Sequence, residues 1–129
     1  MATSTTHPPT TAEQGQAPPD IETMRETTRR VLGPDDAPDL LPPAAEVDTL
    51  AAALRGHLEL LIPEVAETAG PRPYSVQTYC ALACVGEARR KLSVAPGPTL
   101  EARVVHARKL ARVLDSLCDH HERLGETAS

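Results

Sequence analysis

The longest stretches between the proline- and glycine-rich breaks carry apolar residues at every third or fourth position. In residues 43–69 these residues are Val47, Leu50, Ala51, Leu54, Leu58, Leu61, Ile62 and Val65. Residues 99–124 repeat the pattern, with Arg103 and His121 as polar intrusions in the apolar stripe. Side chains at this spacing lie along one face of an α-helix. Each stretch therefore predicts a long helix that buries a single apolar face.

A third long helix is predicted from Ser75, a good N-cap residue, to about Leu92. The first ten residues after the cap, VQTYCALACV, are apolar on almost every side of the helix. A helix that is apolar all round is usually buried on all sides. We therefore expect this helix to be the most central one.

The remaining helix ends are indicated by capping and breaking residues. Asp20 is a suitable N-cap for a short first helix that ends at Gly33. Thr99 is expected to cap the last helix, and Gly125 is expected to stop it.

Residues 1–19 are predicted to form a disordered tail. They contain five Thr and four Pro but no Leu, Ile, Val or aromatic residue. Ordering each residue costs roughly 1 to 2 kcal/mol of conformational entropy, and this segment has too few apolar side chains to offset that cost.

The residue types available for a core narrow the fold class. The chain has no Phe or Trp and only two Tyr, so its core must consist of Leu, Val, Ile and Ala. Strands favour aromatic and β-branched residues, whereas Leu and Ala are strong helix formers. Short connections make successive helices antiparallel neighbours. We therefore predict an all-α protein, a small antiparallel helical bundle of three long helices plus one short N-terminal helix. This domain spans residues 20–125 and is followed by a C-terminal tail, residues 126–129.

The sequence contains no candidate membrane span. No apolar run approaches the roughly 18 to 20 residues that cross a bilayer. The first residues also lack the basic and apolar regions of a secretory signal. We expect a cytoplasmic protein with no membrane partner.

Basic residues gather in the middle of the chain. Residues 70–112 hold eight Lys or Arg and two acidic residues, whereas residues 1–69 hold four basic and twelve acidic residues. This division predicts either charge pairing between helices of one molecule or a basic surface for an anionic partner. The candidate residues for binding DNA or another polyanion are Arg89, Arg90, Lys91, Arg108, Lys109 and Arg112. The long loop before the last helix and the scarcity of aromatic residues argue against nucleic acid.

The three cysteines and one histidine form a candidate metal site. Cys80 and Cys84 are four residues apart on one predicted helix, and Cys118 and His121 are three apart on another. If these helices pack antiparallel, the four side chains suit tetrahedral zinc. Their spacing matches no zinc-finger signature, however, and free cysteines commonly act as small buried hydrophobes. We therefore expect core cysteines and no cofactor.

Four segments of the chain resemble a known family. They are RETTRRVLGPDDAPDLLPPAAEV, LRGHLELLIPEV, YCALACVGEARRKL and ARKLARVLDSLCDHHERL. Across about residues 20–124 the chain resembles small actinobacterial proteins labelled as natural product biosynthesis proteins, which carry a domain of unknown function. The resemblance implies an actinobacterial source and a genomic neighbourhood, but it transfers no activity, fold or site residue.

The absence of catalytic signatures shapes the functional prediction. The sequence has no GxGxxG, GxxxxGK[ST], HExxH, GxSxG or Glu-x-x-His motif, so several common classes of enzyme lack their signature here. We predict a noncatalytic accessory or protein-interaction module, linked to natural product biosynthesis or its regulation, with a protein partner or a second copy as its target. The alternatives are a regulatory protein that binds DNA or another polyanion, and a small metal-binding protein or enzyme that uses the Cys/His cluster.

Overall fold

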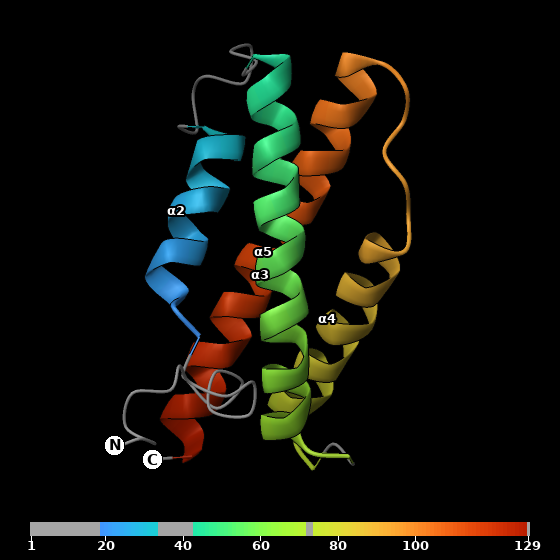
Figure 1. Cartoon of the computed structure of the whole chain (residues 1–129). Helices are drawn as coiled ribbons and strands as arrows, with labels where there is room; N and C mark the ends of the chain where they lie inside the picture. Colours follow the sequence, from blue (N-terminus) through green and yellow to red (C-terminus); the bar gives the residue numbers. More distant parts are fainter. Residues whose placement is uncertain (1–18, 34–42, 72–73, 129) are drawn as a thin grey trace, which may run out of the picture.

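The protein is an all-helical bundle (Figure 1). A computed structural model describes residues 19–33, 43–71 and 74–128. The helices in these ranges are α2 (Ile21–Leu32), α3 (Ala44–Ala69), α4 (Val76–Leu92) and α5 (Leu100–Ala128). The predicted fold class, an all-α bundle of three long helices and a short one, is confirmed. The predicted disordered tail lies outside the described residues except for Pro19.

The helices run alternately up and down, so that successive helices are antiparallel (Figure 1). Helices α3 and α5 each pack against the other three helices. Helices α2 and α4 lie on opposite flanks of this central pair (Figure 1). Each of these two flanking helices therefore has one side that is turned away from the central pair.

The predicted N-caps are confirmed. The Asp20 side chain accepts a hydrogen bond from the backbone N–H of Thr23 (3.1 Å) at the start of α2. Ser75 and Thr78 form a reciprocal capping box at the start of α4. The Thr99 hydroxyl accepts a hydrogen bond from the third residue beyond it (3.0 Å) at the start of α5.

The core is aliphatic, and it lies where the apolar stripes of α3 and α5 meet. Its largest fully buried side chains on these two helices are Leu54, Leu58, Leu61, Leu110, Leu114 and Leu117. The buried residues of α2 are two apolar and two polar ones, namely Met24, Val31, Thr27 and Thr28. Helix α2 thus contributes fewer buried apolar side chains to the core than α3 or α5.

The prediction that α4 is the most central helix is wrong. Val76 is 80% exposed and Tyr79 is 65% exposed, and Cys80 and Ala83 are exposed as well. Helix α4 lies on a flank, so that only the face toward α3 and α5 is covered. Apolar side chains all round a helix therefore did not indicate burial here, because no further helix in the described ranges covers the second face.

The predicted stop at Gly125 is also wrong, because α5 continues to Ala128. A glycine ends a helix readily when it adopts a positive φ. Gly33 and Gly70 do so, with φ values of 72° and 86°, at the ends of α2 and α3. Gly125 is not among the positive-φ residues of the described chain and remains within the helix.

Within the described ranges, no helix combines the length and the apolar character needed to span a membrane.

Candidate functional site

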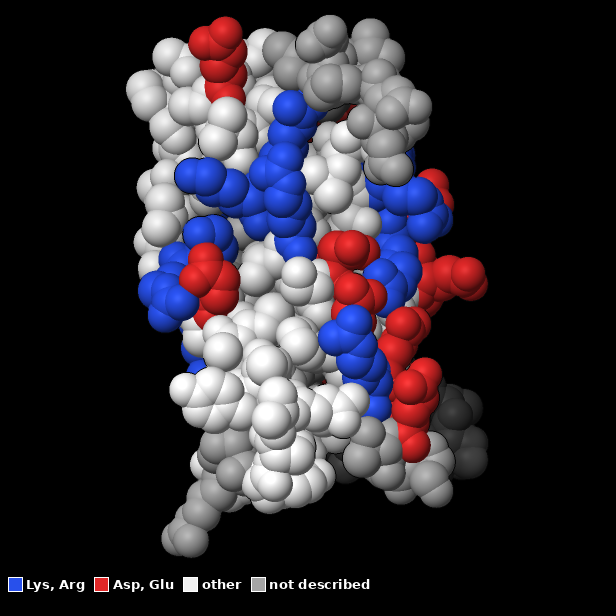
Figure 2. Space-filling view, turned by 180° about the vertical axis from the view of Figure 1, so that it is seen from behind, with Lys and Arg blue, Asp and Glu red and all other residues white. Residues whose placement is uncertain are grey.

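An exposed apolar stripe lies on the first half of α4. We call Val76, Tyr79, Cys80 and Ala83 the α4 outer face. Tyr79, Cys80 and Ala83 follow Val76 by three, four and seven residues, so all four side chains lie on one side of the helix. Figure 2 shows a broad region without Lys, Arg, Asp or Glu in the lower part of this side of the molecule, where α4 begins. Tyr74, which is 75% exposed, lies just before the helix and adds a second aromatic ring.

Charged residues follow the α4 outer face in the second half of the same helix. Glu87 accepts a hydrogen bond from Arg90 (2.6 Å) and forms an ion pair with Lys91 (2.7 Å). These bonds, from Lys91 first and Arg90 second, lower the pKa of the Glu87 carboxyl to about 2. The carboxylate therefore offsets part of the positive charge at the end of α4.

Three of the six candidate polyanion-binding residues lie together. Lys91, Lys109 and Arg112 line a groove of about 310 Å³ between α4 and α5, along with Glu87. The other lining residues are Cys84, Val113 and Ser116. Arg89, Arg90 and Arg108 do not line this groove, so the structure divides the predicted basic cluster.

Charge pairing inside the molecule follows a different pattern from the predicted one. The Arg25 guanidinium of α2 donates hydrogen bonds to Asp115, Asp119 and Glu122 of α5, each at 2.9 Å. These bonds raise the pKa of Arg25 despite its partial burial. This charge cluster ties α2 to the C-terminal half of α5, and its cation comes from the acidic first part of the chain.

An ion pair of the expected kind joins the basic centre to the acidic first part of the chain. Arg103, one of the two predicted polar intrusions, pairs with Asp48 of α3 (3.1 Å). Arg103 is accommodated beside the apolar stripe because Asp48, in the acidic first part of the chain, pairs with its charge.

The four candidate zinc ligands do not converge. Cys80 is exposed, Cys84 is half-buried and Cys118 is buried, and His121 is partly exposed. The part of the chain that the structure describes contains no group of three or more His, Cys, Asp or Glu that could hold a metal ion.

The two more buried thiols are poor nucleophiles in their present surroundings. Burial first, and nearby carboxylates second, raise the pKa of the Cys84 thiol to about 11. Burial raises the pKa of the Cys118 thiol to about 11 as well, although Arg25 opposes the shift. The thiolate is the form that attacks a substrate, so both thiols are largely in the unreactive protonated form at neutral pH.

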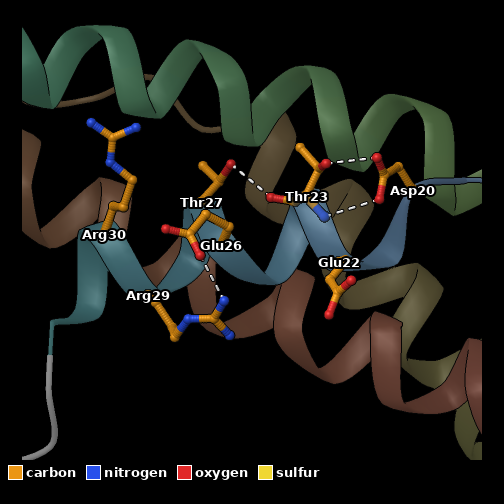
Figure 3. A pocket seen from close by; sticks show the side chains of 7 residues that line it. All are labelled: Asp20, Glu22, Thr23, Glu26, Thr27, Arg29 and Arg30. Carbon is orange, nitrogen blue, oxygen red and sulfur yellow. Dashed lines mark hydrogen bonds and ion pairs between the residues drawn. The ribbon is translucent and has the colours of Figure 1, made fainter.

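A hollow of about 510 Å³ lies beside α2 (Figure 3). Its described wall comes from α2 and its N-cap alone. The polar groups there bond to one another: Asp20 accepts from the Thr23 hydroxyl (2.6 Å), and Glu26 pairs with Arg29 (2.7 Å). Because these side chains are engaged locally, they do not converge on a common point.

Two histidines have structural settings that the sequence did not reveal. The His57 ring nitrogen Nε2 lies 3.2 Å from the Thr27 hydroxyl, which joins α3 to α2. Burial lowers the pKa of His57, although Asp20 opposes the shift. His106 is 8% exposed and lines two further hollows at the α4–α5 loop. In the sequence, His106 lies between Val104 and Ala107, two residues of the buried stripe of α5. This spacing alone does not show whether the histidine belongs to a binding site or lies at the edge of the apolar stripe.

Comparison with known proteins identifies a family. The model described as "Family of unknown function (DUF6415)" matches residues 22–126, and the chain belongs to this family. No curated protein and no solved structure gives a significant match. The predicted resemblance is confirmed for the domain of unknown function, whereas the actinobacterial source and the link to natural product biosynthesis stay predictions.

Proposed function

We propose that this member of the DUF6415 family is a noncatalytic protein-interaction module that pairs with a second copy of itself through the α4 outer face. The observation that carries the proposal is the exposed stripe of Val76, Tyr79, Cys80 and Ala83. Like the sequence-based prediction, the proposal includes a cytoplasmic location in an actinobacterium and a role beside natural product biosynthesis.

The residue types on the α4 outer face are those of an interface core. Contiguous exposed apolar patches mark interaction sites more often than ordinary surface. Tyrosine is enriched at interfaces because its ring is large and its hydroxyl tolerates a wet rim. Tyr74 and Tyr79 are the only aromatic residues of the chain, and both are exposed. A chain that builds its core without aromatic rings has thus placed its two rings at the surface, beside Val76.

A second copy is the occupant that the charge distribution favours. The chain carries a formal net charge of −5, so two copies repel one another at most orientations. In a two-fold symmetric dimer the same patch meets itself. The α4 outer face contains no charged residue, so burying it against its own copy brings no like charges together. Glu87 and Arg90, farther along the same helix, supply both signs of charge at the rim.

The available area suits a modest dimer. A standard interface buries about 800 Å² on each partner. A fully buried tyrosine accounts for about 150 to 250 Å². The two tyrosines, Val76, Cys80 and Ala83 thus supply the central part of such an interface, and the neighbouring charged residues supply its rim.

The oligomeric state tests the proposal directly. We expect the full chain to sediment as a dimer at tens of micromolar and as a monomer on dilution. Tyr79→Lys places a charge at the centre of the paired faces and is expected to give a monomer with unchanged helicity. Leu60→Lys is the matched control, because Leu60 is 62% exposed but belongs to the outer side of α3. This control is expected to remain dimeric.

Cross-linking provides a second, independent measurement. Cys80 is exposed, whereas Cys84 is half-buried and Cys118 is buried. Mild oxidation should therefore give a covalent dimer through Cys80, and Cys80→Ser should abolish it. A chain that is monomeric at every concentration, or a dimer that Leu60→Lys disrupts as strongly as Tyr79→Lys, would overturn the proposal.

A second candidate function is polyanion binding, and the convergence of Lys91, Lys109 and Arg112 in one groove is the observation that favours it. The groove also contains Glu87, whose carboxylate opposes a phosphate backbone. DNA retention at different salt concentrations separates this candidate from the first one, as described in the Discussion.

A further inference from the structure

The α4–α5 loop, residues 93–99, borders two adjoining hollows of about 300 Å³ and 230 Å³. Both hollows are lined by Val94, Ala95 and His106. The larger one also contains Arg55 of α3, and the smaller one contains Lys91 and Lys109. No Asp or Glu is among the described residues that line either hollow.

His106 has an unsatisfied polar atom at this place. The residue is only 8% exposed, so more than nine-tenths of it is buried. Its Nε2 atom has no hydrogen-bond partner among the described residues. Buried polar atoms almost always have a partner. An unpaired ring nitrogen that belongs to a residue lining two hollows therefore indicates a group that the described residues do not supply.

The surroundings of His106 are positively charged. Burial first, and the charges of Arg55 and Lys109 second, lower the pKa of the His106 imidazole. Arg55 donates one hydrogen bond to the Leu92 carbonyl oxygen (2.6 Å), which fixes the guanidinium at the end of α4. A guanidinium has five N–H donors, so Arg55 retains donors for an anion.

Apart from Ser93 in the larger hollow, the rest of the lining is apolar. Val94 and Ala95 line both hollows, and Leu92 lines the larger one. A Cβ atom added to Gly97 would lie only 2.6 Å from the Cβ of Ala102. The loop therefore lies tightly against the first turn of α5, which gives the smaller hollow a defined wall.

We propose that these hollows bind a small organic anion, with a carboxylate or phosphate head group and a short apolar body. The head group lies near Arg55, His106 and Lys109, where it offsets positive charge and supplies a hydrogen-bond partner for Nε2. The apolar body lies against Val94 and Ala95. This site is separate from the α4 outer face, so it extends the proposed function and does not depend on it.

Titration of the isotope-labelled full chain tests the site. The probes are hexanoate and hexyl phosphate, followed by nuclear magnetic resonance of the backbone amides. We expect at least one probe to bind, with the largest shifts at Val94, Ala95 and His106. Hexylamine has the same apolar body and the opposite charge, and inorganic phosphate has the charge without the apolar body. Both are expected to bind at least about tenfold more weakly. The comparison of hexanoate with hexyl phosphate identifies the preferred head group.

Variants distinguish the site from general attraction of anions. Arg55→Gln and Lys109→Gln are each expected to weaken binding about tenfold, a loss typical of one charge-assisted contact. Arg112→Gln is the matched control, because Arg112 lines the neighbouring groove but neither hollow. It should leave the affinity unchanged. Arg55 also caps α4 through its hydrogen bond to Leu92, so the helicity of Arg55→Gln is measured together with its binding. If Arg55→Gln unfolds, Lys109→Gln provides the test.

Three results would overturn the inference. The first is the absence of any shift at millimolar hexanoate and hexyl phosphate. The second is equal binding of hexylamine, which would indicate an unselective apolar hollow. The third is an equal loss of binding in Arg112→Gln, which would assign the effect to the general positive charge of this surface. If duplex DNA shifts the same amides and the hexyl anions do not, the site belongs to a polyanion surface and the proposal also fails.

Discussion

Helices α4 and α5 carry similar apolar residues but occupy different positions in the bundle. Most apolar residues of α5 are buried in one stripe, and α5 packs against all three other helices, whereas Leu100 and Val105 of the same helix are exposed. The first half of α4 is apolar on nearly every side, yet Val76 and Tyr79 face outward. The position of a helix in a bundle is therefore decided by the faces that its neighbours can cover, and excess apolar surface on a flanking helix is left for another use.

Core truncation provides the largest expected contrast between the two helices. Leu114→Ala on α5 is expected to lower the free energy of unfolding by about 2 to 5 kcal/mol, because it removes buried methyl groups and leaves a cavity. Leu54→Ala on the facing α3 should do the same. Val76→Ala on α4 should change the monomer by less than about 0.5 kcal/mol. Chemical denaturation at low protein concentration measures all three, and a large loss for Val76→Ala would mean that its face is covered in the monomer.

The charge cluster at the other flank gives the next effect in size. Arg25→Gln leaves Asp115, Asp119 and Glu122 without their shared cation. Because the three carboxylates are about half exposed, solvent screening limits the expected loss to about 1 kcal/mol. The loss should shrink at high salt, since salt screens the remaining repulsion.

The control for Arg25 is Arg29→Gln on the outer side of the same helix. Arg29 pairs with Glu26 at i,i+3, and both side chains are exposed. Such a pair contributes only about 0.2 to 0.5 kcal/mol. Equal losses for the two variants would show that the α2–α5 cluster adds no stability beyond an ordinary surface pair.

A smaller effect is expected from the pH dependence of stability. Burial lowers the pKa of His57, His106 and His120 in the folded protein. The unfolded chain takes up protons near the ordinary histidine pKa of about 6.5, before the folded protein does. Stability should therefore be unaffected well above that pH and should fall as the pH drops below it. Denaturation curves at a series of pH values measure this slope.

His57→Gln and His106→Gln should each make the pH dependence shallower in the window below about 6.5. Losses that begin only near the carboxylate range, where Glu87 and other acids take up protons, would contradict a role for the buried histidines. The two variants also compare the α2 side of the bundle with the loop side.

The smallest expected effect is on DNA. With the protein-interaction function, duplex DNA should not be retained at physiological ionic strength. Changing Arg108, Lys109 and Arg112 together to Ala should alter neither the helicity nor this result. Micromolar binding that falls steeply with salt and is lost in the triple variant would favour the regulatory alternative over the proposed dimer.

The sequence predicted helix positions well because capping and periodicity are local. Asp20, Ser75 and Thr99 are close in sequence to the backbone groups that they cap, so their roles follow from spacing. The burial of α4 depends instead on how many helices surround it, and a local sequence pattern does not predict that number. The predicted helix end at Gly125 is wrong for a related reason. Glycine allows a helix to end but does not force it to end.

The candidate sites were harder to predict than the fold. Lys91 and Lys109 meet only because α4 and α5 pack antiparallel with a particular rotation about their axes. The same rotation keeps Cys80 exposed while Cys118 is buried in the core. His106 becomes notable only when the loop and Arg55 are folded around it, and these neighbours are distant in sequence. Residues that act together across helices require the packing to be known, whereas residues that cap one helix do not.

The small apolar contribution of α2 to the core affects how easily the bundle opens locally. Two of its four buried residues are threonines, and its contact with α5 depends partly on the solvent-exposed carboxylates around Arg25. Segments with little buried apolar surface open at a lower free energy than the rest of a protein. The amide hydrogens of α2 should therefore exchange with solvent sooner than those at the centre of α3 and α5. If α2 detached while the three longer helices stayed folded, the part of α3 around His57, which now lies against Thr27, would be uncovered.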